Sequence, residues 1–167
     1  MPFGTDLDER RGVVRARRSA RSEWSARWRG YFRVMTIRRV AVNPWRWSLE
    51  FGFNQGEVVE GERRTLYCAG QTATSAEGQP QHAGNMAAQV SMAVDNLEAV
   101  LGEAGMSLAN VVRLNIYTTD VDELLANYGS TAERFQSAGV APPGTLLGVA
   151  RLAFPELLVE IEATAVD

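Results

Sequence analysis

Residues 157–165 read LLVEIEATA, and the nearby residues 142–152 read PPGTLLGVARL. In the first stretch apolar and polar residues alternate, with Leu157, Val159, Ile161, Ala163 and Ala165 on one face and Glu160, Glu162 and Thr164 on the other. This period of two is typical of a half-buried β-strand. Glu160 and Glu162 then point the same way, about 7 Å apart along the strand. Taken alone, the two carboxylates indicate only a solvated sheet face.

Four further segments extend this pattern toward the N-terminus. Residues 51–55 read FGFNQ and residues 66–71 read LYCAGQ, while 89–101 have helical spacing and 111–120 form a strand followed by a Thr-Asp turn. In this order, over about residues 43–167, the segments resemble the Rid family of reactive-intermediate imine and enamine deaminases, also called the YjgF/YER057c/UK114 family. The resemblance implies an α+β domain of the chorismate-mutase-like fold, assembled as a barrel-like homotrimer with ligand clefts between its subunits.

The resemblance also assigns residues to the ligand site. Glu160 matches the glutamate that orients water in the family. Deaminating members carry an arginine immediately before the position of Thr145, and its planar fork suits the carboxylate of a 2-imino acid. This chain has Gly144 there, which carries no charge, and it has Phe53 and Asn54 where the family has tyrosine and serine. We therefore expect a ligand pocket of altered specificity, with substrate contacts from Phe53, Asn54, Gly144, Thr145, Leu146 and Arg151.

Two functions are compatible with this site. The first is a divergent Rid protein that binds a small metabolite in the cleft between subunits without deaminating 2-imino acids. The second is a hydrolase acting on an imine, enamine or related adduct, with Glu160 activating water and backbone amides near Leu146 polarising the electrophile. The place of Arg151 in the motif indicates a structural role more than a catalytic one. An ion pair between Arg151 and Glu160 would oppose a base role, since it favours the charged carboxylate. Glu162 is interpreted as structural or as a subunit contact.

The 167 residues are enough for one domain with a core, and 46% hydrophobic with 22% charged residues is an ordinary globular composition. Residues 1–40 contain eleven arginines and four acids, a net of +7, whereas the rest has a net of −10. The chain has no lysine, which excludes Schiff-base chemistry on a lysine side chain. No apolar run is long enough for a membrane span. We expect a reduced, cytoplasmic protein without a cofactor.

The basic N-terminal segment is considered separately. Residues 1–34 are rich in Arg and Ser and lack a regular apolar period, so we expect a disordered or spurious extension before a single domain at 35–167. Met35 is a plausible alternative start. The segment also contains Trp24 and Trp28 among its arginines, so nucleic acid, an acidic membrane surface or a regulatory partner remain alternative ligands for it. The acidic remainder does not favour nucleic acid.

The rest of the chain predicts a mixed α/β pattern. Strands are expected at 38–42, 55–59, 65–71, 111–118 and within 142–165, with 55–59 and 65–71 joined as a hairpin. Asn85 is expected to cap a helix that runs to about Ala104 and stops at Gly105, and Asp120 to cap a second helix from 121 to 136. Strands interrupted by two long helices predict one sheet with both helices on a single face.

Other chemistries find little support. His82 is the sole histidine and lies in the polar loop at 78–84, where we expect it to be solvated. Cys68 is the sole cysteine and lies in an apolar strand, which indicates an inert buried thiol. The spacing of His, Cys and carboxylates gives no metal site, and no phosphate-binding glycine loop is present in the sequence.

Overall fold

The computed structural model describes residues 37–167, which belong to one compact unit. In chain order the elements are β1 (Arg38–Val42), α2 (Trp47–Glu50), β2 (Gly56–Glu60), β3 (Thr65–Tyr67), β4 (Gln71–Thr72), α3 (Met86–Glu103), the 3₁₀ turn η1 (Leu108–Asn110), β5 (Val111–Thr118), α4 (Val121–Asn127), α5 (Gly129–Ser137), β6 (Gly144–Gly148) and β7 (Val159–Val166). The predictions for residues 1–34 lie outside the described residues.

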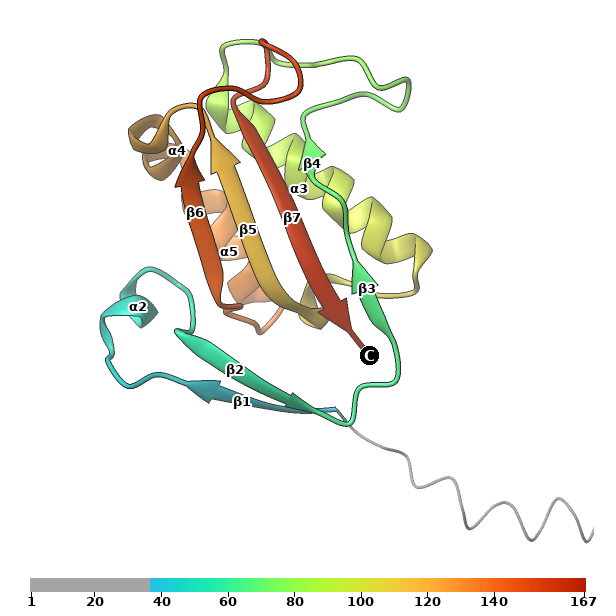
Figure 1. Ribbon diagram of the computed structural model, residues 1–167, viewed down its shortest axis with the longest axis vertical. Helices are drawn as coiled ribbons and strands as arrows, with labels where there is room; N and C mark the ends of the chain where they lie inside the picture. The colour runs from blue at the N-terminus through green and yellow to red at the C-terminus, as the bar shows by residue number, and fades with distance from the viewer. Residues whose placement is uncertain (1–36) are drawn as a thin grey trace, which may run out of the picture. The chain divides into compact units, whose positions relative to one another are not determined.

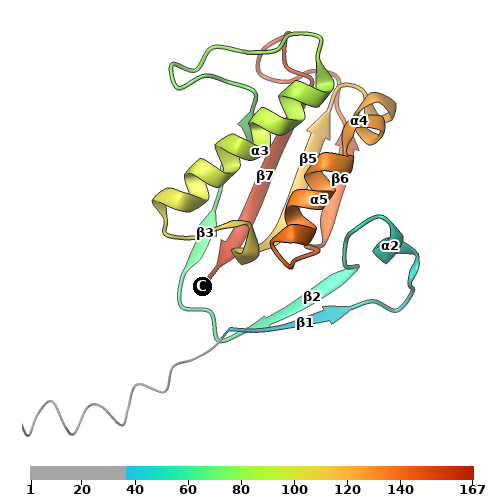
Figure 2. The same ribbon diagram turned by 180° about the vertical axis from the view of Figure 1, so that it is seen from behind.

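The main sheet has the order β3-β7-β5-β6, and β4 pairs with β7 as well (Figure 1). The β5–β6 pair is parallel and the pairs made by β7 are antiparallel, so the sheet is mixed. Figure 2 shows α3 and α5 lying across one face of this sheet. The predicted α+β fold class is therefore confirmed.

The alternating sequence of β7 produces the two faces of the sheet. Val159, Ile161, Ala163 and Ala165 are at most 5% exposed and join the core, whereas the polar residues between them are half-buried on the other face. The core is closed by α3, whose buried row includes Val90, Val94, Leu97 and Leu101. A helical stripe packed on a strand row explains why the helices occupy this face alone.

The predicted limits of α3 are confirmed at both ends. The Asn85 side chain accepts a hydrogen bond from the Ala88 backbone N–H at 3.1 Å, which satisfies one of the free donors of the first turn. After the helix, Gly105 has φ +71°, a left-handed conformation that suits glycine at a helix end. These local signals fix the position of α3 against β7.

The predicted hairpin between residues 55–59 and 65–71 is wrong. β2 pairs instead with β1 as a separate two-stranded sheet, and β3 pairs with β7. The segment between β2 and β3 binds the end of β7, because the backbone N–H groups of Arg63 and Arg64 both donate to the Asp167 carbonyl. The Arg64 guanidinium also forms an ion pair with the Asp167 carboxylate, and the pKa of that carboxyl is lowered mainly by this hydrogen bond.

The two-stranded sheet is anchored to the main sheet by one arginine. The Arg39 guanidinium pairs with Glu57 at 2.7 Å and donates to the carbonyl oxygens of Ala109 and Val111, at 2.6 and 2.7 Å. The acceptor carbonyls belong to η1 and to the first residue of β5. Because Arg39 is part-buried, these charge-assisted bonds are stronger than exposed ones.

The second predicted helix is divided in two. Tyr128 ends α4 and precedes α5, so the chain bends where one continuous helix from 121 to 136 was expected. Gly129 follows directly, and glycine weakens a helix interior by about 1 kcal/mol relative to alanine. Tyr128, at the break between the two helices, lines the cavity described below.

A membrane-spanning helix is not found among residues 37–167, since none of their helices is both long and apolar enough.

Gln89 is a buried polar residue of α3 that holds the loop before β7. Its side chain accepts from the Leu158 N–H at 2.8 Å and donates to the Glu156 carbonyl at 2.7 Å, and the residue is 0% exposed. We predict that Gln89→Leu lowers the free energy of unfolding by about 2–3 kcal/mol, because both backbone groups lose their partner. Urea unfolding at fixed protein concentration measures this. The exposed Gln79→Leu is the control, and an equal loss in both variants would contradict the prediction.

Candidate functional site

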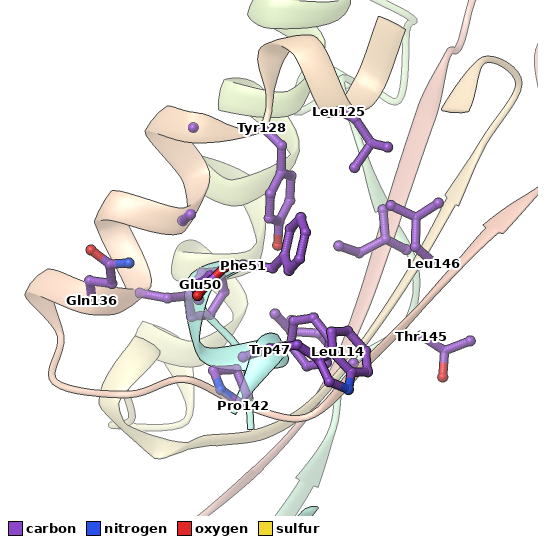
Figure 3. A pocket seen from close by; sticks show the side chains of 17 residues that line it. Trp47, Glu50, Phe51, Leu114, Leu125, Tyr128, Gln136, Pro142, Thr145 and Leu146 are labelled. Atoms are coloured by element: carbon purple, nitrogen blue, oxygen red, sulfur yellow. The ribbon is translucent and has the colours of Figure 1, made fainter. Parts of the chain in front are cut away.

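A cavity of about 560 Å³ lies on the helix-covered side of β5 and β6. Its floor includes Leu114 and Ile116 of β5 and Gly144 and Leu146 of β6. One wall is formed by Leu125, Tyr128, Ala132, Phe135 and Gln136 from α4 and α5, and the other by Trp47, Glu50, Phe51 and Phe53 from the α2 region. Figure 3 shows these side chains gathered around one space. An apolar cavity of this size with few polar groups is typical of small-molecule sites.

The wall at residues 47–53, here called the entrance segment, is held together by its aromatic rings. Trp47 packs edge-to-face on Phe53, with ring centroids 5.7 Å apart, and on Phe51 at 6.3 Å. Gly52 follows with φ +78°, a conformation that a residue with a side chain rarely adopts, and its backbone lies close to Gln136 of α5. The tight turn at Gly52 therefore lets the segment approach the helix.

Asn54 fastens the entrance segment and is not part of the cavity wall. Its backbone N–H donates to the Ala141 carbonyl at 2.8 Å, and its side-chain oxygen accepts from the Asn43 amide at 2.8 Å. The substrate contact expected of Asn54 is therefore not made directly in this chain. Phe53, in contrast, does line the cavity.

Gly144 opens the floor of the cavity at the beginning of β6. A Cβ atom added there would lie 3.4 Å from the Leu114 carbonyl oxygen and 3.8 Å from the Leu114 Cβ, which are ordinary contacts. Its φ is not in the left-handed region. Neither space nor backbone conformation requires glycine here, so the missing side chain affects the cavity and not the fold.

Leu146 faces the cavity beside Gly144, whereas Thr145 between them turns away. Figure 3 shows the Thr145 side chain directed away from the enclosed space. The Thr145 hydroxyl accepts a hydrogen bond from the Arg113 guanidinium on the other face of the sheet. Thr145 lines the cavity, but its side chain is engaged elsewhere.

Glu160 lies on the face of the sheet opposite the cavity. It is half-buried in β7, beside Tyr117 of β5 and Thr72 of β4. Its carboxylate extends over the backbone of Gly70, where an added Cβ would overlap with Oε1. Within residues 37–167 its carboxylate accepts no side-chain or backbone hydrogen bond. One chain therefore does not bring Glu160 to the cavity.

Glu162 has the partners that Glu160 lacks. Its carboxylate accepts hydrogen bonds from the Asn115 amide and from the Tyr117 hydroxyl, the latter at 3.1 Å. Desolvation and this hydrogen bond raise the pKa of Tyr117, so the phenol stays protonated and remains a donor. These contacts support the structural interpretation of Glu162.

The remaining candidates lie outside the cavity. Arg151 is exposed and forms no ion pair with any residue of 37–167, so the considered pair with Glu160 is not made there. His82 is exposed in its loop with φ +56°. Cys68 is buried, which raises the pKa of its thiol and favours the unreactive protonated form. Over the described part of the chain, no cluster of three or more His, Cys, Asp or Glu could hold a metal ion.

Sequence reasoning missed Trp47, Glu50 and Tyr128. Tyr128 falls within the helix predicted at 121–136, and the structure places it between α4 and α5, where it lines the cavity. Burial raises the pKa of Tyr128 to about 12, so its hydroxyl is protonated at neutral pH. The aromatic composition of residues 45–53 was a signal for the entrance segment, although it did not indicate which rings would face the cavity.

Comparison with known proteins shows similarity over most of the described chain. Residues 50–167 match the family model described as Endoribonuclease L-PSP. A RutC family protein of Synechocystis is 33% identical over 115 residues, which are 68% of this chain and 85% of that protein. The Rid family protein YyfB of Yersinia pestis is 36% identical with a TM-score of 0.70, over 77% of this chain and 98% of that one. Rv2704 of Mycobacterium tuberculosis, a member of the YjgF/YER057c/UK114 family, is 30% identical with a TM-score of 0.52, over 78% and 100% of the two chains.

The contact between Gly70 and Glu160 gives a stability test of the open face. We predict that Gly70→Ala costs about 1 kcal/mol in free energy of unfolding, because the new methyl group displaces the Glu160 side chain. The same substitution in a Glu160→Ala background should cost almost nothing, and a double-mutant cycle by urea unfolding measures the difference. Gly102→Ala is the control: nothing lies within 4 Å of its added Cβ, so its effect on stability should be the same in both backgrounds. Equal costs in both backgrounds would place the Glu160 side chain elsewhere.

Proposed function

Because this chain belongs to the Rid family, in which small-molecule binding and imine-deaminase chemistry are the family roles, we propose that it binds a small metabolite in the cavity at β6 without deaminating 2-imino acids. Gly144 is the observation that carries this proposal. A 2-imino acid needs a cation for its carboxylate, and among the described residues no arginine lines the cavity. The floor and helical wall consist mainly of apolar side chains, which favour an apolar part of a ligand.

The proposal includes a homotrimer with the ligand in a cleft between subunits. On the open face of the sheet, Tyr67 is 80% exposed and Leu147 is 49% exposed. Tyr67 pairs with Thr164, which lies on the same face of β7 as Glu160. Leu147 pairs with Tyr117, which in turn pairs with Glu160, so both exposed side chains lie on the Glu160 face. A neighbouring copy seated on this face would remove that area from water and bring its own cavity near Glu160. Such a site would combine the cavity of one subunit with the carboxylate of the next.

The alternative function is hydrolysis of an imine or enamine that lacks a carboxylate. It is favoured by one observation, namely that the Glu160 carboxylate has no partner in residues 37–167 and can accept a hydrogen bond from water. In this reaction water adds to the C=N carbon, Glu160 accepts the proton, and protonation of nitrogen releases the amine from the new carbonyl compound. Backbone amides near Leu146 would polarise the electrophile.

The proposal is tested by ammonia release from freshly generated 2-iminopropanoate with the full-length protein. We expect the rate to equal that of buffer alone, because the cavity offers no cation for the substrate carboxylate. Release well above the buffer rate would overturn the proposal.

For the alternative, a neutral aldimine replaces the substrate, and Glu160→Gln should then lower the hydrolysis rate by about 100-fold, because the amide cannot accept the proton from water. Glu156→Gln is the matched control, since Glu156 is an exposed carboxylate of the loop before β7 and does not line the cavity. Its rate should equal that of the unchanged protein. An equal loss in both variants, or no loss in Glu160→Gln, would contradict the alternative.

Restoring the missing cation should restore carboxylate binding. We predict that Gly144→Arg increases the affinity for 3-phenylpropanoate by about tenfold, measured by isothermal titration calorimetry, since a bidentate pair contributes about 1.5–3 kcal/mol before its ordering cost. Gly144→Gln has a long neutral side chain and is the matched control. An equal gain in both variants would indicate a packing effect and not charge recognition.

A further inference from the structure

The cavity has one charged side chain in its wall. Among residues 37–167 that line it, Glu50 alone has a carboxylate side chain, and no arginine or histidine accompanies it. Figure 3 shows Glu50 next to Phe51, on the wall formed by the entrance segment. The site in this chain therefore has a negative charge and lacks the positive one expected for a carboxylate ligand.

The nearby arginines do not neutralise Glu50. Arg134 of α5 is paired with Asp95 at 2.8 Å and with Glu98, and Arg113 donates to Thr145 on the other face of the sheet. Arg46 precedes α2 but does not line the cavity. Glu50 forms no ion pair within the described residues. A cationic ligand would supply the missing partner.

Aromatic rings surround the same end of the cavity. Trp47 is 54% exposed and Phe51 is 67% exposed, although both line the cavity, and they meet edge-to-face. An edge-to-face pair leaves ring faces available, and a ring face attracts an ammonium group within about 6 Å of its centroid. The Glu50 carboxylate and the two rings therefore both favour a cationic group of the ligand.

The deeper part of the cavity suits an apolar body. Leu114, Ile116 and Phe135 are each at most 6% exposed and form its inner surface. The Tyr128 hydroxyl, which has no hydrogen-bond partner among residues 37–167, can donate one to a ligand in the same space. Figure 3 shows its side chain directed toward the entrance segment. The cavity thus has an anionic, aromatic end and an apolar interior.

We propose that the cavity selects an apolar amine in its ammonium form, with the cationic head at Glu50, Trp47 and Phe51 and the apolar body against Leu114 and Ile116. This inference rests on the proposed binding function and defines the class of ligand. It assigns specificity to the entrance segment, because the rings and the carboxylate all come from residues 47–53.

Three probes of similar shape and different charge test the inference: 3-phenylpropylamine, 3-phenylpropanol and 3-phenylpropanoate. Their affinities for the full-length protein are measured at pH 7 by isothermal titration calorimetry. We expect the amine to bind about tenfold more tightly than the alcohol, from the ion pair and the cation–π contact together, and the carboxylate to bind most weakly. Glu50→Gln should remove the preference of the amine over the alcohol and leave alcohol binding unchanged.

Glu133→Gln is the matched control. Glu133 is a carboxylate of α5 that does not line the cavity, so its removal changes the net charge equally but should preserve the preference for the amine. An equal loss of the preference for the amine in both variants would show that net charge alone causes this preference, which would overturn the inference. Equal binding of amine and alcohol would overturn the inference while supporting an apolar binding site. Absence of binding by all three probes would contradict both the inference and the proposed function.

Discussion

The pairing of β7 with three other strands constrains the rest of the structure. β3 and β4 bond to one edge of β7 and β5 to the other, so a shift of one residue in its register would exchange the apolar row for the glutamates. The buried row holds α3 through the core, and the parallel β5–β6 pair continues the sheet to the cavity floor. The position of the cavity therefore depends on the alternating sequence of β7, whose residues are far from the entrance segment.

The same constraint separates the two halves of the chemistry. Gly144 and Leu146 share a face with the core, whereas Glu160 shares the opposite face with Tyr117 and Glu162. The main sheet lies between the cavity and the Glu160 carboxylate, and side chains on one face do not reach the other face. Glu160 of one chain could therefore take part only in a reaction at the cavity of a neighbouring copy, whereas the residues that line the cavity described here all come from a single chain.

Strong local patterns predicted part of this structure correctly. The alternation of β7 and the capped stripe of α3 each agree with their tertiary environment, and the resemblance identified Phe53, Gly144 and Leu146, which meet in one cavity. The predicted partner of β2 was wrong, because strand spacing does not reveal the ion pair and the backbone hydrogen bonds that hold residues 63–64 at the end of β7. Tyr128 was missed because helical spacing does not distinguish a side chain packed in the core from one that lines a cavity.

The entrance segment lies in a part of the chain that contributes no strand to the main sheet. It connects β1 to β2, and those two strands pair only with each other among the described residues. Arg39 and the backbone of Asn54 attach this part to β5 and to Ala141. Substitutions of the exposed residues between 45 and 51 therefore leave the core packing intact. In evolutionary terms, selection can change the entrance side of the cavity without changing the core, whereas the cavity surface at Leu114, Ile116 and Phe135 belongs to the core and is constrained by fold stability.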